Sequence, residues 1–110
     1  MMAKMRIIAR NTLTAYAASL VGNKDQPAVK AALDAWYQMV GEATWANSMA
    51  LKAQFGSASI VGARAVFNIK GNDYRLVVDV DYQRETVFIK WIGTHAEYDR
   101  IDVRTVQYGD

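Results

Sequence analysis

The chain has 110 residues, of which 52% are hydrophobic and 11% aromatic, so we expect one compact domain over residues 1–110. It has no cysteine, which excludes disulfide bonds and thiolate metal sites. No apolar run reaches the length of a membrane span and the N-terminus lacks the apolar core of a signal peptide, so a cytoplasmic protein is expected. The formal net charge of +2 permits a nucleic-acid partner but does not by itself predict one.

The chain begins with a pattern typical of one short strand and a helix. Residues 5–8, with the sequence MRII, predict the strand. Asn11 or Thr12 is then predicted to cap a helix. Its apolar residues follow the i, i+3, i+4, i+7 spacing of a buried helical stripe and are Leu13, Tyr16, Ala17 and Leu20.

A second helix is expected to start just after Asp25 or Gln26, because Pro27 suits the first turn of a helix. Gly41 lies near its end, and its predicted buried stripe is Val29, Leu33, Trp36 and Val40. A short third helix is predicted to be capped by Thr44 and to run through Trp45 and Met49. We interpret these helices as scaffold.

From Val61 onward the pattern changes to strands. Residues 64–70, 74–82 and 86–92 are rich in β-branched and aromatic side chains. Gly71 and Asn72 form a two-residue hairpin turn between the first two strands, and residues 83–86 are expected to join the second and third. The turn predicts the cross-strand pairs Lys70–Asp73, Asn68–Arg75 and Phe67–Leu76, and the next connection predicts Tyr82–Val87, Val80–Ile89 and Val78–Trp91.

This register predicts a sheet with two different faces. One face, here called the covered face, is expected to lie under the helices and to comprise Ala65, Phe67, Ile69, Tyr74, Leu76, Val78, Val80, Tyr82, Val87, Ile89 and Trp91. The other, here called the polar face, is expected to comprise Arg64, Val66, Asn68, Arg75, Val77, Asp79, Asp81, Phe88, Lys90 and Ile92. The register also sets Arg75 opposite Thr94, beside the only histidine, His95.

The polar face carries the residue types that metal-free RNA cleavage requires. The reaction must move protons at the 2′-hydroxyl and the leaving 5′-oxygen and must stabilise charge on the phosphate. His95 can transfer protons, Arg75 and Lys90 can neutralise phosphate, and Tyr98 can stack on a base. Each residue also has a structural alternative. His95 could be a turn residue, Arg75 and Lys90 could belong to an ion-pair face with Asp79, and Tyr98 could cover a small core.

A metal site is the weaker interpretation of the same residues. Asp79, Asp81, Glu97 and Asp99 offer oxygen ligands for a hard cation. A single histidine and the absence of cysteine nevertheless argue against a dedicated metal site, so we expect neither a metal nor another cofactor.

Two stretches resemble one known family. The segments VFNIKGNDYRLVVDVDY (66–82) and VFIKWIGTHAEYDRID (87–102), at this spacing, are similar to the HigB toxins of the RelE/ParE superfamily. The resemblance implies an α+β fold, with a small RelE-like, microbial-ribonuclease-like antiparallel sheet and the N-terminal helices packed on one face. It implies an endoribonuclease that cuts mRNA, generally at the translating ribosome, and a helix-turn-helix antitoxin of the HigA type through which the complex binds operator DNA.

The resemblance also assigns roles to residues. It implies Arg75, Lys90, His95 and Tyr98 as the catalytic set, and the remaining RNA contacts are expected from Arg64, Asn68, Lys70 and Asp99. Here Thr94 and His95 follow Gly93, where many RelE-like toxins place basic residues, so proton donor and acceptor stay unassigned. Two rivals stay open, a ParE-like gyrase poison without nuclease activity and a non-enzymatic interaction domain. The segment 103–110 is expected to be a solvated tail, in which Arg104 could touch RNA.

Overall fold

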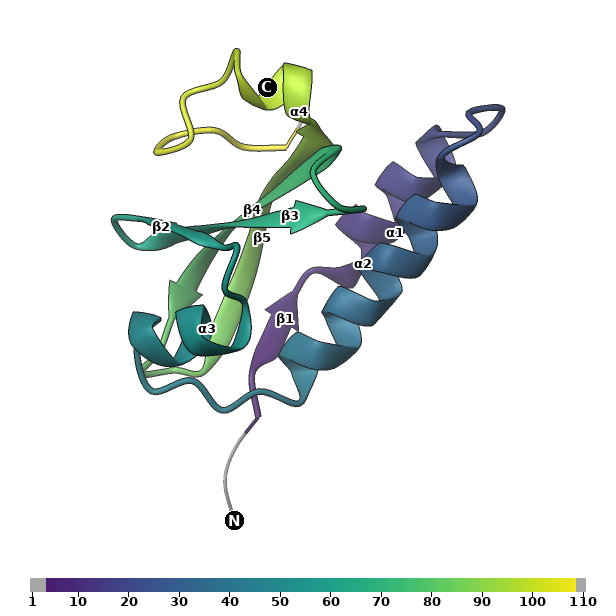
Figure 1. Cartoon of the computed structure of the whole chain (residues 1–110). Helices are drawn as coiled ribbons and strands as arrows, with labels where there is room; N and C mark the ends of the chain where they lie inside the picture. Colours follow the sequence, from purple (N-terminus) through teal and green to yellow (C-terminus); the bar gives the residue numbers. More distant parts are fainter. Residues whose placement is uncertain (1–3, 109–110) are drawn as a thin grey trace.

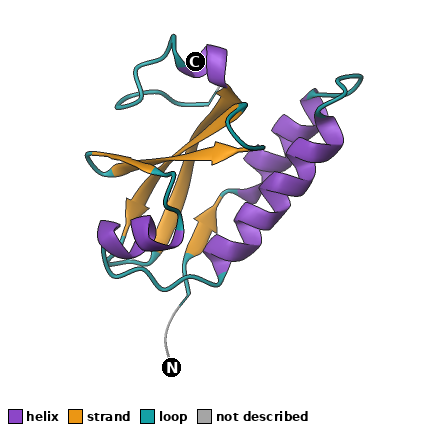
Figure 2. Ribbon diagram, viewed as in Figure 1, coloured by secondary structure: helices purple, strands orange, loops and turns teal. Residues whose placement is uncertain are grey.

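The computed structural model describes residues 4–108, which form a five-stranded sheet and four helices (Figures 1 and 2). The elements in chain order are β1 (Arg6–Ile8), α1 (Arg10–Ser19), α2 (Gln26–Gly41), α3 (Ser48–Gln54), β2 (Ser59–Val61), β3 (Arg64–Ile69), β4 (Tyr74–Asp81), β5 (Thr86–Thr94) and α4 (His95–Tyr98). None of the helices within this range is both long and apolar enough to cross a bilayer.

The sheet has the strand order β1-β5-β4-β3-β2. The three pairs among β2, β3, β4 and β5 are antiparallel, whereas β1 pairs in parallel with β5. Helices α1 and α2 lie side by side on one face, as Figure 2 shows. The expected α+β fold is therefore confirmed, with the correction that β1 makes the sheet mixed, and β2 was not foreseen. A parallel partner is possible because α1 and the following elements supply the long crossover that it needs.

The predicted helical stripes are confirmed more closely than the predicted caps. Leu13, Tyr16 and Ala17 of α1 are buried, as is the whole predicted stripe of α2. Neither Asn11 nor Thr12 caps α1, which begins after Ala9 without a side-chain cap. Pro27 lies in the first turn of α2, as predicted.

Helix α3 begins four residues after the predicted cap Thr44. Its N-cap is Asn47, whose side-chain oxygen accepts a hydrogen bond from Ala50 N at 3.0 Å. Trp45 lies before the helix and is buried against Phe55 and Phe67, with ring centroids 6.0 and 6.5 Å away. Packing of the indole therefore holds Trp45 outside the helix, which begins directly after Asn47, a residue able to cap it.

The register of the β3–β4 hairpin agrees with the prediction. Phe67 pairs with Leu76 and Asn68 with Arg75, and Asp73 N donates to Lys70 O at 3.2 Å to close the turn. Gly71 has a φ of 64°, a conformation that glycine adopts without steric cost.

The predicted register of β4 and β5 is wrong. Val80 pairs with Val87, and Val78 with Ile89, because the connecting turn closes earlier through a hydrogen bond from Glu85 N to Tyr82 O of 3.3 Å. A register shift between Val77 and Val78 then leaves one extra residue, Lys90, in β5.

The shift exchanges two side chains between the faces. Trp91 pairs with Val77 on the polar face, and Ile92 packs in the main core, the reverse of the prediction. Arg75 consequently pairs with Gly93 rather than Thr94. An insertion of one residue reverses every side chain beyond it, so the predicted faces are wrong from Trp91 onward.

The segment after α4 covers part of the polar face. Val106 is buried and forms a second, smaller core with Val66, Val77 and Trp91. The prediction of a solvated tail is therefore wrong for Val103 and Val106, which pack in this core, whereas residues 104, 105, 107 and 108 are exposed. Residues 109 and 110 lie outside the described range. Figure 1 shows this C-terminal segment, defined as residues 101–108, after α4 and above β2 and β3 in that view.

Candidate active site at the end of the sheet

The candidate site lies where β5 runs directly into α4, and we use strand-end site for Asn72, Arg75, His95, Tyr98 and Asp99 together. Thr94 caps α4, because its Oγ1 accepts a hydrogen bond from Glu97 N at 3.1 Å. Glu97 Oε1 in turn accepts from Thr94 N at 2.8 Å, which completes a capping box. His95 N donates to Asp73 O at 2.8 Å and so ties α4 to the β3–β4 turn.

The turn holds the guanidinium of Arg75 in place. Its Nη1 donates to Asn72 O at 2.9 Å and to Tyr74 O at 3.2 Å, and its Nη2 donates to Asn72 Oδ1 at 2.7 Å. Within residues 4–108 no carboxylate pairs with Arg75, and its Nε–H has no hydrogen-bond partner. Arg75 is therefore oriented by neutral acceptors and keeps its full positive charge for an anionic ligand.

His95 Nε2 faces two groups with opposite demands. It lies 3.5 Å from Arg75 Nη2 and 3.7 Å from Asp99 Oδ1, and its side chain is 44% exposed. A guanidinium can only donate, so it favours the unprotonated nitrogen, whereas the carboxylate favours the protonated one. Nε2 therefore has a donor beside it for its unprotonated form and an acceptor beside it for its protonated form.

Tyr98 is placed by an aromatic contact. Its ring centroid lies 6.4 Å from that of Trp91, and Arg75 Cζ lies 5.9 Å from the Tyr98 ring. The Trp91 ring also lies over Gly93, where an added Cβ would meet ring carbons at 2.5 and 2.6 Å. Because Gly93 has no side chain, the Trp91 ring can occupy this space, where it contacts the Tyr98 ring beside Arg75.

Two predicted RNA contacts flank this site. Asn68 lies opposite Arg75 on β3, is half-buried and makes no side-chain hydrogen bond within the described range. Lys70 Nζ lies 2.8 Å from Asp73 Oδ2 and 3.7 Å from Asp25 Oδ1, so it joins the α1–α2 connection to the hairpin turn. The hydrogen bond from Lys70 lowers the pKa of Asp73.

Lys90 and Arg64 lie apart from the strand-end site. Lys90 Nζ is directed to Asp79 Oδ2, 3.8 Å away, and to the Phe88 ring, 5.8 Å away. The small core around Val77 and the C-terminal segment separates this group from Arg75. The predicted single cluster is therefore divided in two. Lys90 and Gly93, which pairs with Arg75, are three residues apart on β5, or about 10 Å.

Arg64 is committed to the fold. It is only 8% exposed, and its Nε donates to Asp79 Oδ1 at 3.1 Å. Its Nη1 donates to Val103 O at 3.0 Å and to Val106 O at 2.8 Å. These bonds fasten the C-terminal segment to β3, and the expected RNA contact of Arg64 stays a prediction.

Asn72 and the capping pair Thr94–Glu97 are site residues that sequence reasoning did not identify. The T-x-x-E spacing of residues 94–97 was a usable signal, because it is the pattern of a capping box. Asn72 was interpreted only as a turn residue, and its contact with Arg75 depends on the closed hairpin.

The acidic residues considered as metal ligands are engaged elsewhere. Asp79 pairs with Arg64 and Lys90, Asp81 with Arg84, and Asp99 faces His95. Across the described part of the chain, no three His, Asp or Glu side chains gather as they would around a metal ion.

A hollow of about 550 Å³ lies away from these residues, between α1 and α2. Leu13, Ala17 and Leu33 contribute to its apolar lining, and Arg10 and Asp34 are among its charged residues. It contains none of the residues of the strand-end site.

Comparison with known proteins identifies the family. The sequence model of the HigB toxins, described as the RelE-like toxic component of a toxin–antitoxin system, matches residues 29–101. No curated protein matches the chain individually. The matched range is more than half of the chain and includes α3, β2 to β5 and α4 together with every residue of the strand-end site. The chain therefore belongs to the HigB toxin family, the RelE-like toxic components of toxin–antitoxin systems.

Proposed function

We propose that the protein is an endoribonuclease that cleaves mRNA and thereby arrests growth. The observation that carries the proposal is the contact of 3.5 Å between Arg75 Nη2 and His95 Nε2, which sets a fixed cation beside a proton-transfer group. A phosphodiester placed against both would have its charge neutralised where its bonds change. The HigB family membership supports this activity over gyrase poisoning.

In the proposed reaction the 2′-oxygen attacks the adjacent phosphorus as its proton leaves, and the bond from phosphorus to the 5′-oxygen breaks as that oxygen gains a proton. Arg75 stabilises the charge that develops on the phosphate oxygens. His95 Nε2 carries the proton, and Asp99 stabilises the protonated imidazole. Tyr98 borders the position of the phosphate, where its ring can stack on a base. The products are a 2′,3′-cyclic phosphate and a 5′-hydroxyl end.

The proposed partners follow from the family membership. Toxins of this family act with an antitoxin. We propose a helix-turn-helix antitoxin of the HigA type, which also connects the complex to operator DNA, and mRNA on the ribosome as the substrate. With such a substrate, we propose that the protein acts in the cytoplasm.

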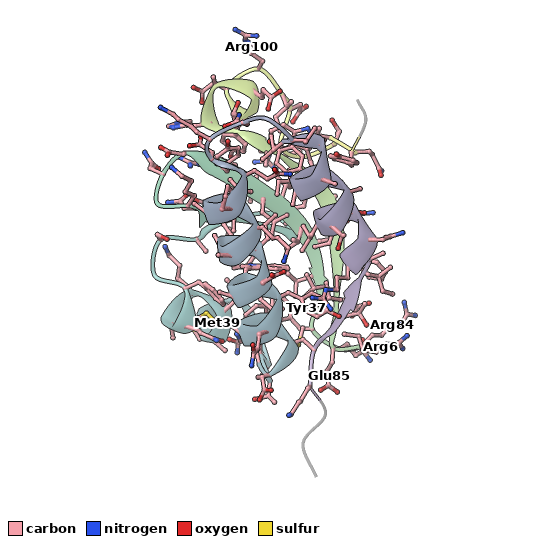
Figure 3. All side chains as sticks on the ribbon, turned by 90° about the vertical axis from the view of Figure 1, so that its right-hand side faces the viewer. Arg6, Tyr37, Met39, Arg84, Glu85 and Arg100 are labelled. Atoms are coloured by element: carbon pink, nitrogen blue, oxygen red, sulfur yellow. The ribbon has the colours of Figure 1, made fainter. Side chains whose placement is uncertain are left out.

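The test is expression of the chain from a tightly repressed promoter, with mapping of new 5′ ends in cellular RNA. We expect growth arrest with fresh cuts inside translated reading frames. We expect cleavage to fall about 10²–10⁴-fold in His95→Ala and about 10²–10³-fold in Arg75→Ala. The control is Arg100→Ala, which changes an exposed arginine outside the proposed set (labelled in Figure 3).

Three results would contradict the proposal. Growth arrest with intact transcripts and supercoiling-defective DNA would assign the protein to the gyrase poisons. Unchanged cleavage by His95→Ala would remove His95 from proton transfer. No growth effect and no RNA cleavage by purified protein would favour an interaction domain.

A further inference from the structure

The polar face continues beyond the C-terminal segment into an exposed patch at the β1 edge of the sheet. The pairings of β1 with β5 set Arg6 beside Thr86 and Ile8 beside Phe88. Ile7 and Val87 point into the main core, so Arg6, Ile8 and Phe88 lie on the polar face by strand alternation. We use sheet-edge patch for Arg6, Ile8, Phe88 and Lys90.

The sheet-edge patch combines an apolar surface with positive charge. Ile8 is 42% exposed and Phe88 half-buried, and Lys90 Nζ lies 5.8 Å from the Phe88 ring centroid. The neighbouring carboxylate of Asp79 is shared by Lys90 and Arg64. Arg6 is exposed and pairs with no carboxylate within residues 4–108. Within the described residues, Lys90 thus shares its only carboxylate with Arg64, and Arg6 has none, so the patch carries net positive charge and attracts anions.

We propose that the sheet-edge patch is a second binding site for single-stranded RNA, distinct from the strand-end site. A base stacks on Phe88 against Ile8, and Lys90 and Arg6 contact the flanking phosphates. An aromatic ring with adjacent cations on an open sheet is the arrangement that binds single strands without sequence preference. The inference rests on the proposed function, because the sheet-edge patch gives the same nuclease a second contact with its RNA substrate.

The spacing of the two sites determines how long an RNA must be to use both. Gly93 pairs with Arg75 and Phe88 with Asp79, and these partners are four residues apart on β4, or about 13 Å along the strand. A short oligonucleotide at the strand-end site therefore ends before Phe88, whereas a longer one crosses the C-terminal segment and reaches it. The sheet-edge patch consequently raises affinity only for longer RNA.

The experiment measures RNA binding by fluorescence anisotropy with His95→Ala protein, which does not consume the probe. The probes are unstructured RNAs of about three and about twelve nucleotides, within the range of site sizes for single-strand binding folds. We expect Phe88→Ala in this background to weaken binding of the longer RNA about 5- to 150-fold and to leave the shorter one unchanged. Because a misfolded variant would lose both, the length dependence separates stacking from folding.

A second variant tests the electrostatic part. Lys90→Gln should make log Kd for the longer RNA less dependent on log salt by about 0.7, the value of one phosphate contact on a single strand. Lys24→Gln is the matched control, because Lys24 is exposed, pairs with no carboxylate within the described residues and lies in the α1–α2 connection. It should leave the salt slope unchanged.

The outcomes separate this inference from the proposed function. One outcome is that the wild-type protein cleaves RNA but Phe88→Ala and Lys90→Gln bind the longer RNA as tightly as the protein without these substitutions. The sheet-edge patch is then not an RNA site, although the proposed nuclease function is retained. If Phe88→Ala instead weakens only the complex with the antitoxin, the sheet-edge patch is a protein-docking surface and the inference is overturned. If the wild-type protein neither cleaves nor binds RNA, the proposed function and the inference fail together.

Discussion

At the scale of single residues, the strand-end site is organised by neutral hydrogen-bond acceptors around a charged donor. Asn72 supplies two acceptors to Arg75, one from its backbone and one from its side chain. Gly93 supplies space rather than a functional group, since the Trp91 ring occupies the volume where a side chain would be. Both residues act on the proposed chemistry through the residues they position.

Asn72→Ala removes the side-chain acceptor of Arg75. A hydrogen bond to a charged group contributes about 1.5–3 kcal/mol, so we expect kcat for RNA cleavage to fall roughly 10- to 100-fold with a smaller change in stability. The control is Asn11→Ala, because Asn11 is exposed on α1 and its side chain makes no hydrogen bond within residues 4–108. Equal kcat in the two variants would mean that Asn72 does not position Arg75.

Gly93→Ala places a methyl group against the Trp91 ring and 2.9 Å from Glu97 Oε1. We expect a loss of about 1–3 kcal/mol in the free energy of unfolding, measured by urea denaturation, as for other overpacked sites. Gly56→Ala is the matched control, because nothing lies within 4 Å of its added Cβ. Stability equal to that of the control would show that Trp91 moves aside without cost.

At the scale of elements, short segments are held by specific local bonds. Helix α4 has only four residues and is stabilised by its capping box and by the bond from His95 N to Asp73 O. Lys70 in the β3–β4 turn forms an ion pair with Asp25 in the α1–α2 connection. Isolated helices of this length do not form in water, so these contacts determine where His95 lies.

Thr94→Ala removes the N-cap of α4. We expect unfolding to become easier by about 1 kcal/mol, and RNA cleavage to fall because His95 is no longer held beside Arg75. Thr44→Ala is an instructive control, since Thr44 has the position of a predicted cap but precedes α3 without capping it. If both variants cleave RNA at the wild-type rate, the capping box does not contribute to the proposed site.

The pH dependence of stability reports the bond between Lys70 and Asp73. The folded-state pKa of Asp73 lies below its ordinary value of 3.8, so this contribution is present above 3.8 and is lost as the pH falls through the lowered value. Asp73→Asn should therefore be less stable than wild type at neutral pH and approach it in strong acid. In a Lys70→Met background the substitution should have little effect at any pH, and an undiminished effect there would exclude this ion pair as the cause.

At the scale of the whole molecule, the C-terminal segment completes the sheet. It is fixed by Arg64 through two carbonyl groups and by Val106, which fills the second core. Tyr108 reaches Tyr16 of α1, with ring centroids 6.4 Å apart. The same segment divides the polar face into the strand-end site and the sheet-edge patch, which is why Lys90 and Arg75 do not meet.

Val106→Ala opens a cavity in the second core. We expect a loss of about 1–3 kcal/mol in the free energy of unfolding, from lost burial and the unfilled space. Val21→Ala is the matched control, because Val21 is 79% exposed and should change stability by less than about 0.5 kcal/mol. A similar effect in both variants would mean that the C-terminal segment does not pack as described.

Local patterns in the sequence determined most of the fold. Helical periodicity identified the buried residues of α1 and α2, and the Gly71–Asn72 turn set the β3–β4 register, because both signals depend on neighbours a few residues apart. Arg75 and His95 were consequently predicted to lie near each other, as they do.

Only the tertiary structure decided the arrangement beyond Lys90. The extra residue in β5, the rotation of Trp91 to the polar face and the burial of Val106 all result from contacts between segments distant in the sequence. A bulge changes alternation without changing composition, and a covering segment is recognisable only from what it covers. The sequence alone therefore specified which residues could act, and the tertiary packing decided which of them lie together.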